Sequence, residues 1–240
     1  MDPRRLESLH ALGLPAWARR PGAVLPGAPE AWRVPAEPVE PAEAPAPPAA
    51  DDTVGLDWEA LEARVTACTL CPLHAGRTRT VFGVGNRRAD LLVIGEAPGA
   101  EEDRRGEPFV GRAGKLLDAM LAALGHDRSE VYIANVVKCR PPQNRDPRPE
   151  EAASCAPYLD RQVALLQPRV ILAVGRVAAQ RLLDTEASVG RLRGRVHRYG
   201  PAGTPLVVTW HPAYLLRRPE AKAEAWRDLV LAAEAAGVGR

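Results

Sequence analysis

The segment DLLVIGEAPGAEEDRRGEPFVGRAG, residues 90–114, decides the fold because it joins a short apolar run to a glycine-rich loop and then to a helix. Almost wholly apolar runs recur downstream and alternate with stretches of helical periodicity. Strands of this kind are typical of a parallel sheet that helices cover on both faces. We therefore predict an α/β fold, a three-layer α/β/α domain around a central, mostly parallel four-stranded sheet.

Composition divides the chain into two parts. Residues 1–52 are rich in proline, alanine and acids and have no periodic apolar face, which predicts a disordered N-terminal extension. Residues 53–240 carry the alternating strand and helix patterns of one domain. Within the extension, residues 4–20 have an amphipathic pattern, which indicates a docking helix for an unidentified protein partner or, alternatively, a frayed terminal helix.

Bulk properties restrict location more than they restrict function. The net charge of +2 neither supports nor excludes nucleic acid, because a DNA-binding enzyme needs only a local basic stripe. No secretory signal peptide is recognisable, and no apolar run approaches the roughly 18 residues of a membrane span. We expect a monomeric, cytoplasmic protein without a membrane partner.

Chemically distinctive residues occur at three predicted strand ends. Glu96 follows LLVIG, Asn135 lies in YIANVVKC, and His211 follows PLVVTW. Ligands of such sheets bind beyond the carboxyl ends of the strands, so we expect these residues on one rim, together with Phe109 of the glycine-rich loop. Each residue taken singly also has a purely structural explanation. Together, a carboxylate, an amide, an imidazole and an aromatic face predict a site for a flat heterocycle.

The amide of Asn135 makes the predicted ligand more specific. It can donate to a carbonyl and accept from a ring N–H, which matches the edge of uracil and mismatches that of cytosine. Phe109 would stack on the base without choosing among bases. Gly95 and Ala97 flank Glu96, and we expect them to line the same pocket, where Gly95 allows close approach of the backbone.

Three segments are candidates for DNA contact. Arg112 and Lys115 lie in the first turn of a predicted helix, where a phosphate could bind. The segment HPAYLLRRP places bulky and basic residues after His211, as a wedge-and-phosphate loop requires; core leucines and a solvated helix start are the alternative. Its candidates are Leu215, Leu216 and Arg217. In RLRGRVHR, arginines 191, 193 and 195 would share one face of a strand, which fits either a DNA backbone or a charged, exposed edge.

The four cysteines have the spacing of a metal site. Cys68 and Cys71 form a C-x2-C pair, and Cys139 and Cys155 follow far downstream. Two disulfides are not expected in a reducing compartment. The spacing favours an iron-sulfur cluster over zinc, because zinc ribbons usually show a second close pair. Zinc and buried free thiols remain the alternatives.

Five features in order resemble family 4 of the uracil-DNA glycosylase superfamily over about residues 57–236. They are G-E-A-P-G followed by E-E-D, G-x-P-F-V-G-R-A-G-x-L-L, N-V-V-K-C-R-P-P, the cysteine spacing and T-W-H-P-A-Y-L-L-R. The resemblance implies that the four cysteines ligate a 4Fe-4S cluster, that Phe109 stacks on a flipped-out uracil and that Asn135 reads its edge. It implies further that His211 donates to the uracil O2, that Glu96 handles water, and that Glu102 is a candidate gate against the thymine methyl.

The activity that this resemblance implies is hydrolysis of the N-glycosidic bond of deoxyuridine in single- or double-stranded DNA. The products would be free uracil and an abasic site, the first step of base-excision repair. A related branch cross-links to uracil through a histidine in a loop after the Asn strand, but the corresponding KCRPPQNRDPRPEE has no histidine, which predicts ordinary turnover. The alternatives are a non-catalytic or covalently trapping uracil-DNA-binding protein of the same superfamily, and an iron-sulfur electron carrier.

Overall fold

The structure is a computed structural model, and it describes residues 53–237. The N-terminal extension, residues 1–52, and the docking helix predicted within it lie outside the described residues.

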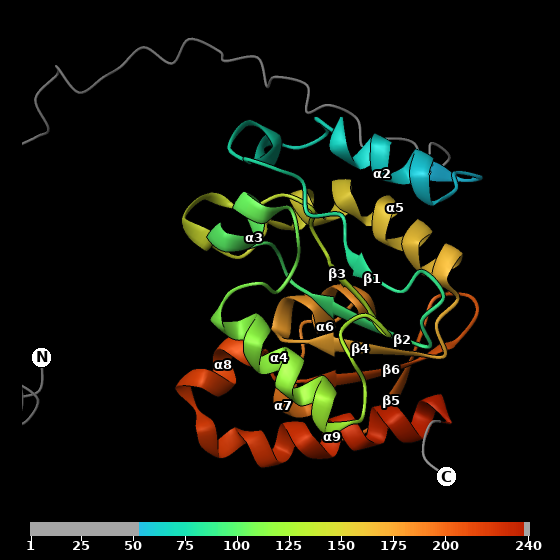
Figure 1. The fold of residues 1–240 in the computed structure, drawn as a ribbon, viewed down its shortest axis with the longest axis vertical. Helices are drawn as coiled ribbons and strands as arrows, with labels where there is room; N and C mark the ends of the chain where they lie inside the picture. Colours follow the sequence, from blue (N-terminus) through green and yellow to red (C-terminus); the bar gives the residue numbers. More distant parts are fainter. Residues whose placement is uncertain (1–52, 238–240) are drawn as a thin grey trace, which may run out of the picture. The chain divides into compact units, whose positions relative to one another are not determined.

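One sheet runs through the described domain, in the strand order β1-β3-β2-β4-β6-β5 (Figure 1). Its strands are β1 (Val84–Gly85), β2 (Leu91–Gly95), β3 (Tyr132–Asn135), β4 (Val170–Val174), β5 (Val196–Tyr199) and β6 (Thr204–Thr209). The central strands β3, β2, β4 and β6 are parallel, whereas β1 and β5 pair antiparallel at the two edges. The predicted α/β class and its parallel core of four strands are confirmed, and two short edge strands extend the sheet.

Helices cover both faces of this sheet. They are α2 (Trp58–Thr66), α3 (Ala100–Arg105), α4 (Arg112–Ala123), α5 (Pro149–Leu166), α6 (Arg176–Leu183), α7 (Val189–Leu192), α8 (Pro212–Arg217) and α9 (Lys222–Ala236). Short 3-10 turns lie at Pro72–Ala75, Pro142–Asn144 and Pro219–Ala221. No helix among the described residues is long and apolar enough to cross a membrane.

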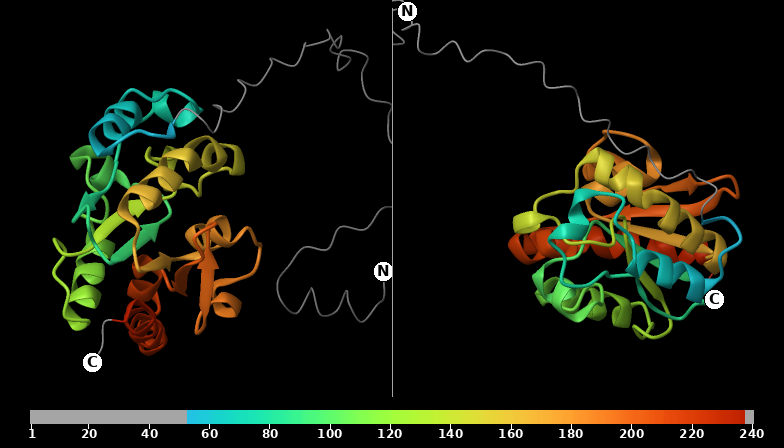
Figure 2. Two further views of the ribbon diagram at one scale, coloured as in Figure 1. Left: turned by 90° about the vertical axis from the view of Figure 1, so that its right-hand side faces the viewer. Right: turned by 90° about the horizontal axis from the view of Figure 1, so that it is seen from above.

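The alternation of side chains along each strand divides the core into two layers. Leu92 and Ile94 of β2 pack with α2, α5, α6 and α7, whereas Leu91 and Val93 pack with α4, α8 and α9. In Figures 1 and 2, α5 and α9 accordingly lie on opposite sides of the sheet. Because both faces are buried, the central strands are apolar throughout, which is the pattern that predicted them.

The arginine-rich segment differs from its prediction. Residues 189–192 form α7 and β5 begins only at Val196, so arginines 191, 193 and 195 share no strand face. Arg193 points inward instead, and its Nε lies 3.0 Å from a carboxylate oxygen of Asp228, a side chain with no solvent exposure. One of the three arginines thus forms an ion pair with a buried carboxylate of α9, a contact that the spacing of the arginines in the sequence could not predict.

Candidate active site

The carboxyl ends of β2, β3 and β6 bring the predicted site residues together. Gly95 ends β2 in register with Asn135, the last residue of β3, and Glu96 follows directly. His211 comes two residues after β6 and begins α8 as its N-cap. The ring of Phe109, from the loop between α3 and α4, has its centroid 5.6 Å from that of His211 with the planes inclined by 31°.

The side chain of Asn135 is buried with an unused acceptor. Asn135 is 2% exposed, and within residues 53–237 its Oδ1 is the single buried side-chain nitrogen or oxygen that lacks a hydrogen-bond partner. Burying a carbonyl oxygen without a partner is unfavourable, so such an atom indicates a site for a donor from a ligand. A Cβ on Gly95 would lie 2.5 Å from this oxygen and 2.6 Å from Cζ of Phe109, which explains why glycine is needed there.

His211 is held as a neutral ring with a defined tautomer. Its Nδ1 accepts a hydrogen bond from the main-chain N–H of Ala213 at 3.1 Å. Burial, with a further contribution from Arg217, lowers the pKa of His211 to about 4. At neutral pH the proton therefore resides on Nε2, which leaves that nitrogen as a donor. Gly175, at φ +96°, allows the close packing, because a Cβ there would lie 3.0 Å from the His211 Cβ.

The pKa of Glu96 is displaced in the opposite direction, upward. Burial, followed by the adjacent carboxyl of Asp146, raises its pKa to about 7, while Arg176 opposes the shift. Arg176 forms an ion pair with Asp146, which connects the N-terminus of α6 to the loop before α5. A carboxyl group poised near neutral pH at a strand end is suited to accept a proton.

The backbone of Phe109 is strained and clamped. Its φ is +53°, in the left-handed region that large side chains seldom adopt, and its side chain is nonetheless buried. Arg128 donates to the carbonyl oxygens of Phe109, at 3.3 Å, and of Pro108. The same guanidinium pairs with Asp118 at 2.9 Å and Glu107 at 3.2 Å. These contacts fix the aromatic face of the site.

Glu102 lies close enough to raise the pKa of His211 slightly, but its hydrogen bonds go to the backbone. Its two carboxylate oxygens accept from the N–H groups of Gly99 at 3.1 Å and of Val110 and Gly111 at 3.0 Å. This carboxylate therefore caps α3 and fastens the loop of Phe109 to it. The gating role of Glu102 stays a prediction beside this structural one.

The predicted DNA contacts separate into surface and core residues. Arg112 and Lys115 are exposed on the first turn of α4, and Arg217 is exposed at the end of α8. Leu216 is 39% exposed, whereas Leu215 is 1% exposed and packs in the core between α4, α8 and α9. The prediction that Leu215 belongs to a DNA wedge is therefore wrong, because α8 turns this side chain inward.

All four cysteines line one small cavity, together with Arg77 and Lys138. Their thiols are free, and Arg77 donates to the Sγ of Cys139 at 3.2 Å. Burial raises the pKa of Cys71, of Cys139 and, to about 12, of Cys155. Among residues 53–237 no group of three or more His, Cys, Asp or Glu side chains is close enough to hold a single metal ion. Four cysteine sulfurs that border one cavity are donors of the kind that both zinc and iron-sulfur sites use.

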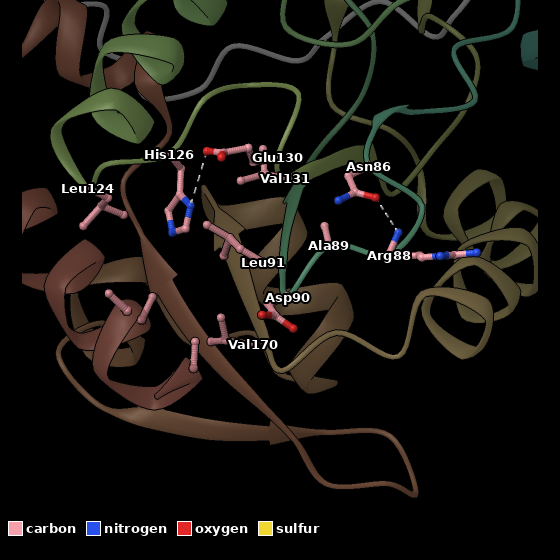
Figure 3. Close-up of a pocket in the computed structure, with 13 residues that line it drawn as sticks. Asn86, Arg88, Ala89, Asp90, Leu91, Leu124, His126, Glu130, Val131 and Val170 are labelled. Atoms are coloured by element: carbon pink, nitrogen blue, oxygen red, sulfur yellow. Dashed lines mark hydrogen bonds and ion pairs between the residues drawn. The ribbon is translucent and has the colours of Figure 1, made fainter. Parts of the chain in front are cut away.

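A second cavity, of about 240 Å³, lies at the other end of the sheet (Figure 3). Leu91 and Val170, the first residues of β2 and β4, line it with the side chains of His126 and Glu130, in which Nδ1 of His126 lies 4.0 Å from Oε2 of Glu130. None of the predicted site residues borders this cavity. The candidate site is thus defined by the carboxyl ends of the strands and not by this hollow.

Sequence reasoning missed three residues that support the site. Arg128 clamps the Phe109 loop, Asp146 contacts Glu96, and Lys138 donates to the main-chain oxygen of Asn135. Each acts on a residue through contacts across the fold or through its backbone, so no local spacing marks it. Only Lys138 carried a signal, because a lysine is unusual at the end of the apolar stretch YIANVVKC that the sequence predicts as a buried strand.

Comparison with known proteins assigns this arrangement to a class. Residues 82–230 match the family model of the uracil DNA glycosylase superfamily, so the chain belongs to that superfamily. Among its relatives, the type-4 uracil-DNA glycosylase of Archaeoglobus fulgidus is 46% identical over 180 residues, which are 72% of this chain and 90% of that protein. The type-4 enzyme of Pyrobaculum aerophilum is 41% identical over 182 residues, covering 73% and 93%, respectively.

A third relative, the type-4 uracil-DNA glycosylase of Thermotoga maritima, is 46% identical over 160 residues, or 66% of this chain and 83% of that protein. The predicted resemblance to the type-4 family is thereby confirmed.

Proposed function

We propose that this protein excises uracil from DNA by hydrolysing the N-glycosidic bond, which releases the base and leaves an abasic site for repair. The observation that carries the proposal is the unpaired, buried Oδ1 of Asn135 beside Phe109 and His211. The names of the type-4 relatives support the same activity.

Asn135 would select the base by its edge. Oδ1 accepts from the N3–H of uracil, and the amide NH₂ donates to O4. Cytosine presents an acceptor at N3 and a donor at C4, so both hydrogen bonds would become repulsive contacts. Phe109 stacks on the base, and its clamped, strained backbone keeps the ring in place without an ordering cost on binding. Gly95 and Ala97 would form the floor next to it.

His211 and Glu96 would act on the two charges that form as the bond breaks. When the N1–C1′ bond cleaves, its electron pair goes to uracil, and the negative charge spreads to O2. The Nε2–H of neutral His211 donates to that oxygen, a role in which a preorganised donor is most effective. Water adds to C1′ of the cationic sugar and loses its proton to the Glu96 carboxylate, which also stabilises the cation.

We further propose that Cys68, Cys71, Cys139 and Cys155 hold a 4Fe-4S cluster. The four thiols share one cavity, and two cations, Arg77 and Lys138, line it, as an anionic thiolate site requires. When bound, the cluster would cross-link α2, the end of β3 and α5, which is a structural role. The chain's own residues carry out the reaction at the rim.

DNA would lie across the same rim as the flipped base. Exposed Leu216 would fill the space that the base leaves, and the exposed Arg217, Arg112 and Lys115 would contact phosphates. Cysteines without disulfide bonds fit a cytoplasmic enzyme, and the monomeric state stays a prediction.

Release of free uracil from an oligonucleotide with one deoxyuridine tests the activity, with thymine and cytosine oligonucleotides as controls. We expect release only from the uracil substrate. His211→Ala should reduce the rate by about 10²–10³-fold, as loss of one charge-stabilising donor does. His126→Ala, at the far end of the sheet, is the matched control. Tight binding of uracil-DNA without release would identify a non-catalytic binder, and a covalent adduct a trapping protein.

Iron and acid-labile sulfide analysis tests the cofactor separately. A brown protein with about equal amounts of the two elements supports the cluster. A colourless protein with one zinc ion per chain contradicts it, and redox cycling without any DNA dependence would favour an electron carrier.

A further inference from the structure

Lys138 lies buried between the cysteine cavity and the base-reading amide. The chain has three lysines, and Lys115 and Lys222 are exposed on helices, whereas Lys138 is 1% exposed. Its Nζ lies 2.9 Å from the main-chain oxygen of Asn135 and 2.6 Å from Oε1 of Gln162. Both of these acceptors are neutral groups.

The charge of Lys138 has no carboxylate to balance it. Within the described residues no carboxylate forms an ion pair with its ammonium, and the sulfurs of Cys139 and Cys155 line the cavity that Lys138 borders. The main-chain N–H of Lys138 also donates to the Cys155 sulfur at 3.4 Å. An uncompensated buried charge destabilises a fold, so an anionic thiolate site in the adjoining cavity is the counter-charge that this lysine needs.

The same ammonium holds the strand end from which Asn135 projects. The next two residues are tied to the neighbouring strand end, because Val136 donates to the Gly95 oxygen at 2.9 Å and Val137 to the Glu96 oxygen at 3.2 Å. The carbonyl of Asn135 itself is held by Lys138. Since the Asn135 Oδ1 has no partner in the protein, the position of this amide depends on its backbone.

Gln162 anchors the lysine to the helix that carries Cys155. Its Oε1 accepts from Lys138, and its Nε2 donates to the Phe82 oxygen at 2.9 Å and to the Tyr132 hydroxyl at 3.3 Å. Its side chain is fully buried. The lysine therefore joins α5, the cysteine cavity and the end of β3 through satisfied polar contacts.

We infer that Lys138 is a positioning residue that couples the cysteine cavity to base reading: the thiolates balance its charge, and its ammonium keeps the Asn135 peptide in register with uracil. The inference rests on the proposed function and cluster.

A double-mutant cycle tests whether Lys138 acts through Asn135. We expect Lys138→Met to lower kcat/KM for uracil excision by about 10-fold or more, and to weaken inhibition by free uracil, in protein that retains its iron. In an Asn135→Ala background the same change should have little further effect, because contacting residues are not additive. Equal effects in both backgrounds overturn the inference. Lys222→Met is the exposed control and should change neither value.

The reduction potential of the bound cluster tests the counter-charge. Removing a cation beside the thiolates favours the oxidised, more positive cluster, so Lys138→Met should lower the potential and Lys222→Met should not. An unchanged potential in iron-loaded Lys138→Met overturns the inference.

If Lys138→Met does not fold, Gln162→Met provides a second variant. It keeps the charge of Lys138 but removes the side chain that anchors it, and it should give a smaller loss of uracil affinity that again vanishes with Asn135→Ala. Wild-type protein that releases uracil but contains no iron would refute the cluster and this coupling, and would leave the proposed activity intact.

Discussion

At the scale of single residues, burial at the same edge of the sheet shifts the pKa values of Glu96 and His211 in opposite directions. Burial raises the pKa of Glu96 to about 7 and lowers that of His211 to about 4, because burial disfavours the charged form of each. The combination that the proposed mechanism requires, an ionised Glu96 with a neutral His211, therefore prevails above about pH 7. Between about pH 4 and 7 both groups are neutral.

The pH profile of uracil release should report Glu96 and not His211. We expect kcat/KM to fall as pH drops below about 7. Asp146→Asn removes a negative charge that raises the pKa of Glu96, so the acid limb should move to lower pH. Glu101→Gln changes an exposed carboxyl that is paired with Arg104, and it should leave the limb in place. An acid limb that does not move in Asp146→Asn would contradict the assignment.

At the scale of elements, two short connections determine the shape of the site. Glu102 joins the N-terminus of α3 to the loop of Phe109, and Arg145 joins the loop before α5 to the buried carboxylate of Glu151, its Nη2 lying 2.6 Å from Oε1. Glu102 lies in α3 and Glu151 in α5, and each side chain binds a loop outside its own helix. Both hold loops that carry site residues, Phe109 in one case and Asp146 in the other.

Glu102→Gln should destabilise the loop of Phe109. The amide places an NH₂ group where an oxygen now accepts backbone N–H groups, which should lower the free energy of unfolding by about 1–3 kcal/mol. Urea unfolding measures this loss, and the rate of uracil release should fall with it. Glu101→Gln on the same helix breaks only an exposed pair with Arg104, so its unfolding free energy should stay close to that of the wild type. Equal stabilities of the two variants would argue against the fastening role of Glu102.

The neighbouring leucines of α8 should behave differently. Leu215→Ala opens a cavity in the core and should cost about 2–5 kcal/mol of unfolding free energy. Leu216→Ala should change stability by less than about 0.5 kcal/mol but lower excision from double-stranded more than from single-stranded DNA, since only a duplex has a gap to fill. The wedge role fails if Leu216→Ala affects both substrates alike.

At the scale of the whole molecule, the proposed recognition of DNA depends on a local surface. A net charge of +2 gives little overall attraction, so binding depends on cations near the rim. The opposite end of the sheet has its own cavity, but it lies away from every residue assigned to the base. The proposed DNA path therefore runs along one end of the fold, where the ends of the parallel strands share one edge.

Salt dependence of DNA binding tests this local surface. Arg217→Ala should weaken binding and reduce the magnitude of the slope of log K against log salt concentration by about 1, the value for one lost phosphate contact. Arg227→Ala, which removes an exposed arginine of α9, should leave the slope unchanged. A fluorescence-anisotropy titration at several salt concentrations gives both slopes. Identical slopes for the two variants would indicate that bound DNA does not contact α8.

The sequence alone determined the layers of the fold and the strand ends at which the candidate site residues meet. Apolar strands that alternate with helices require a parallel sheet buried on both faces, and such a sheet brings Glu96, Asn135 and His211 to one edge. The edge strand β1 escaped prediction because two residues carry no periodicity. The arginine-rich segment was mispredicted, because its alternating pattern fits a strand while the chain forms α7 there.

Only the tertiary structure decided that Leu215 and not Leu216 is buried in the core, and that Arg193 pairs with Asp228. It also decided which backbone groups the side chains of Glu102, Arg128 and Lys138 bind. These contacts join residues from elements far apart in the chain, or side chains to backbone, and they leave no periodic trace in the sequence. A six-residue helix such as α8 has no long apolar stripe from which its inward face could be read. The pattern of residue types thus specified the chemistry, and packing specified the positions from which it acts.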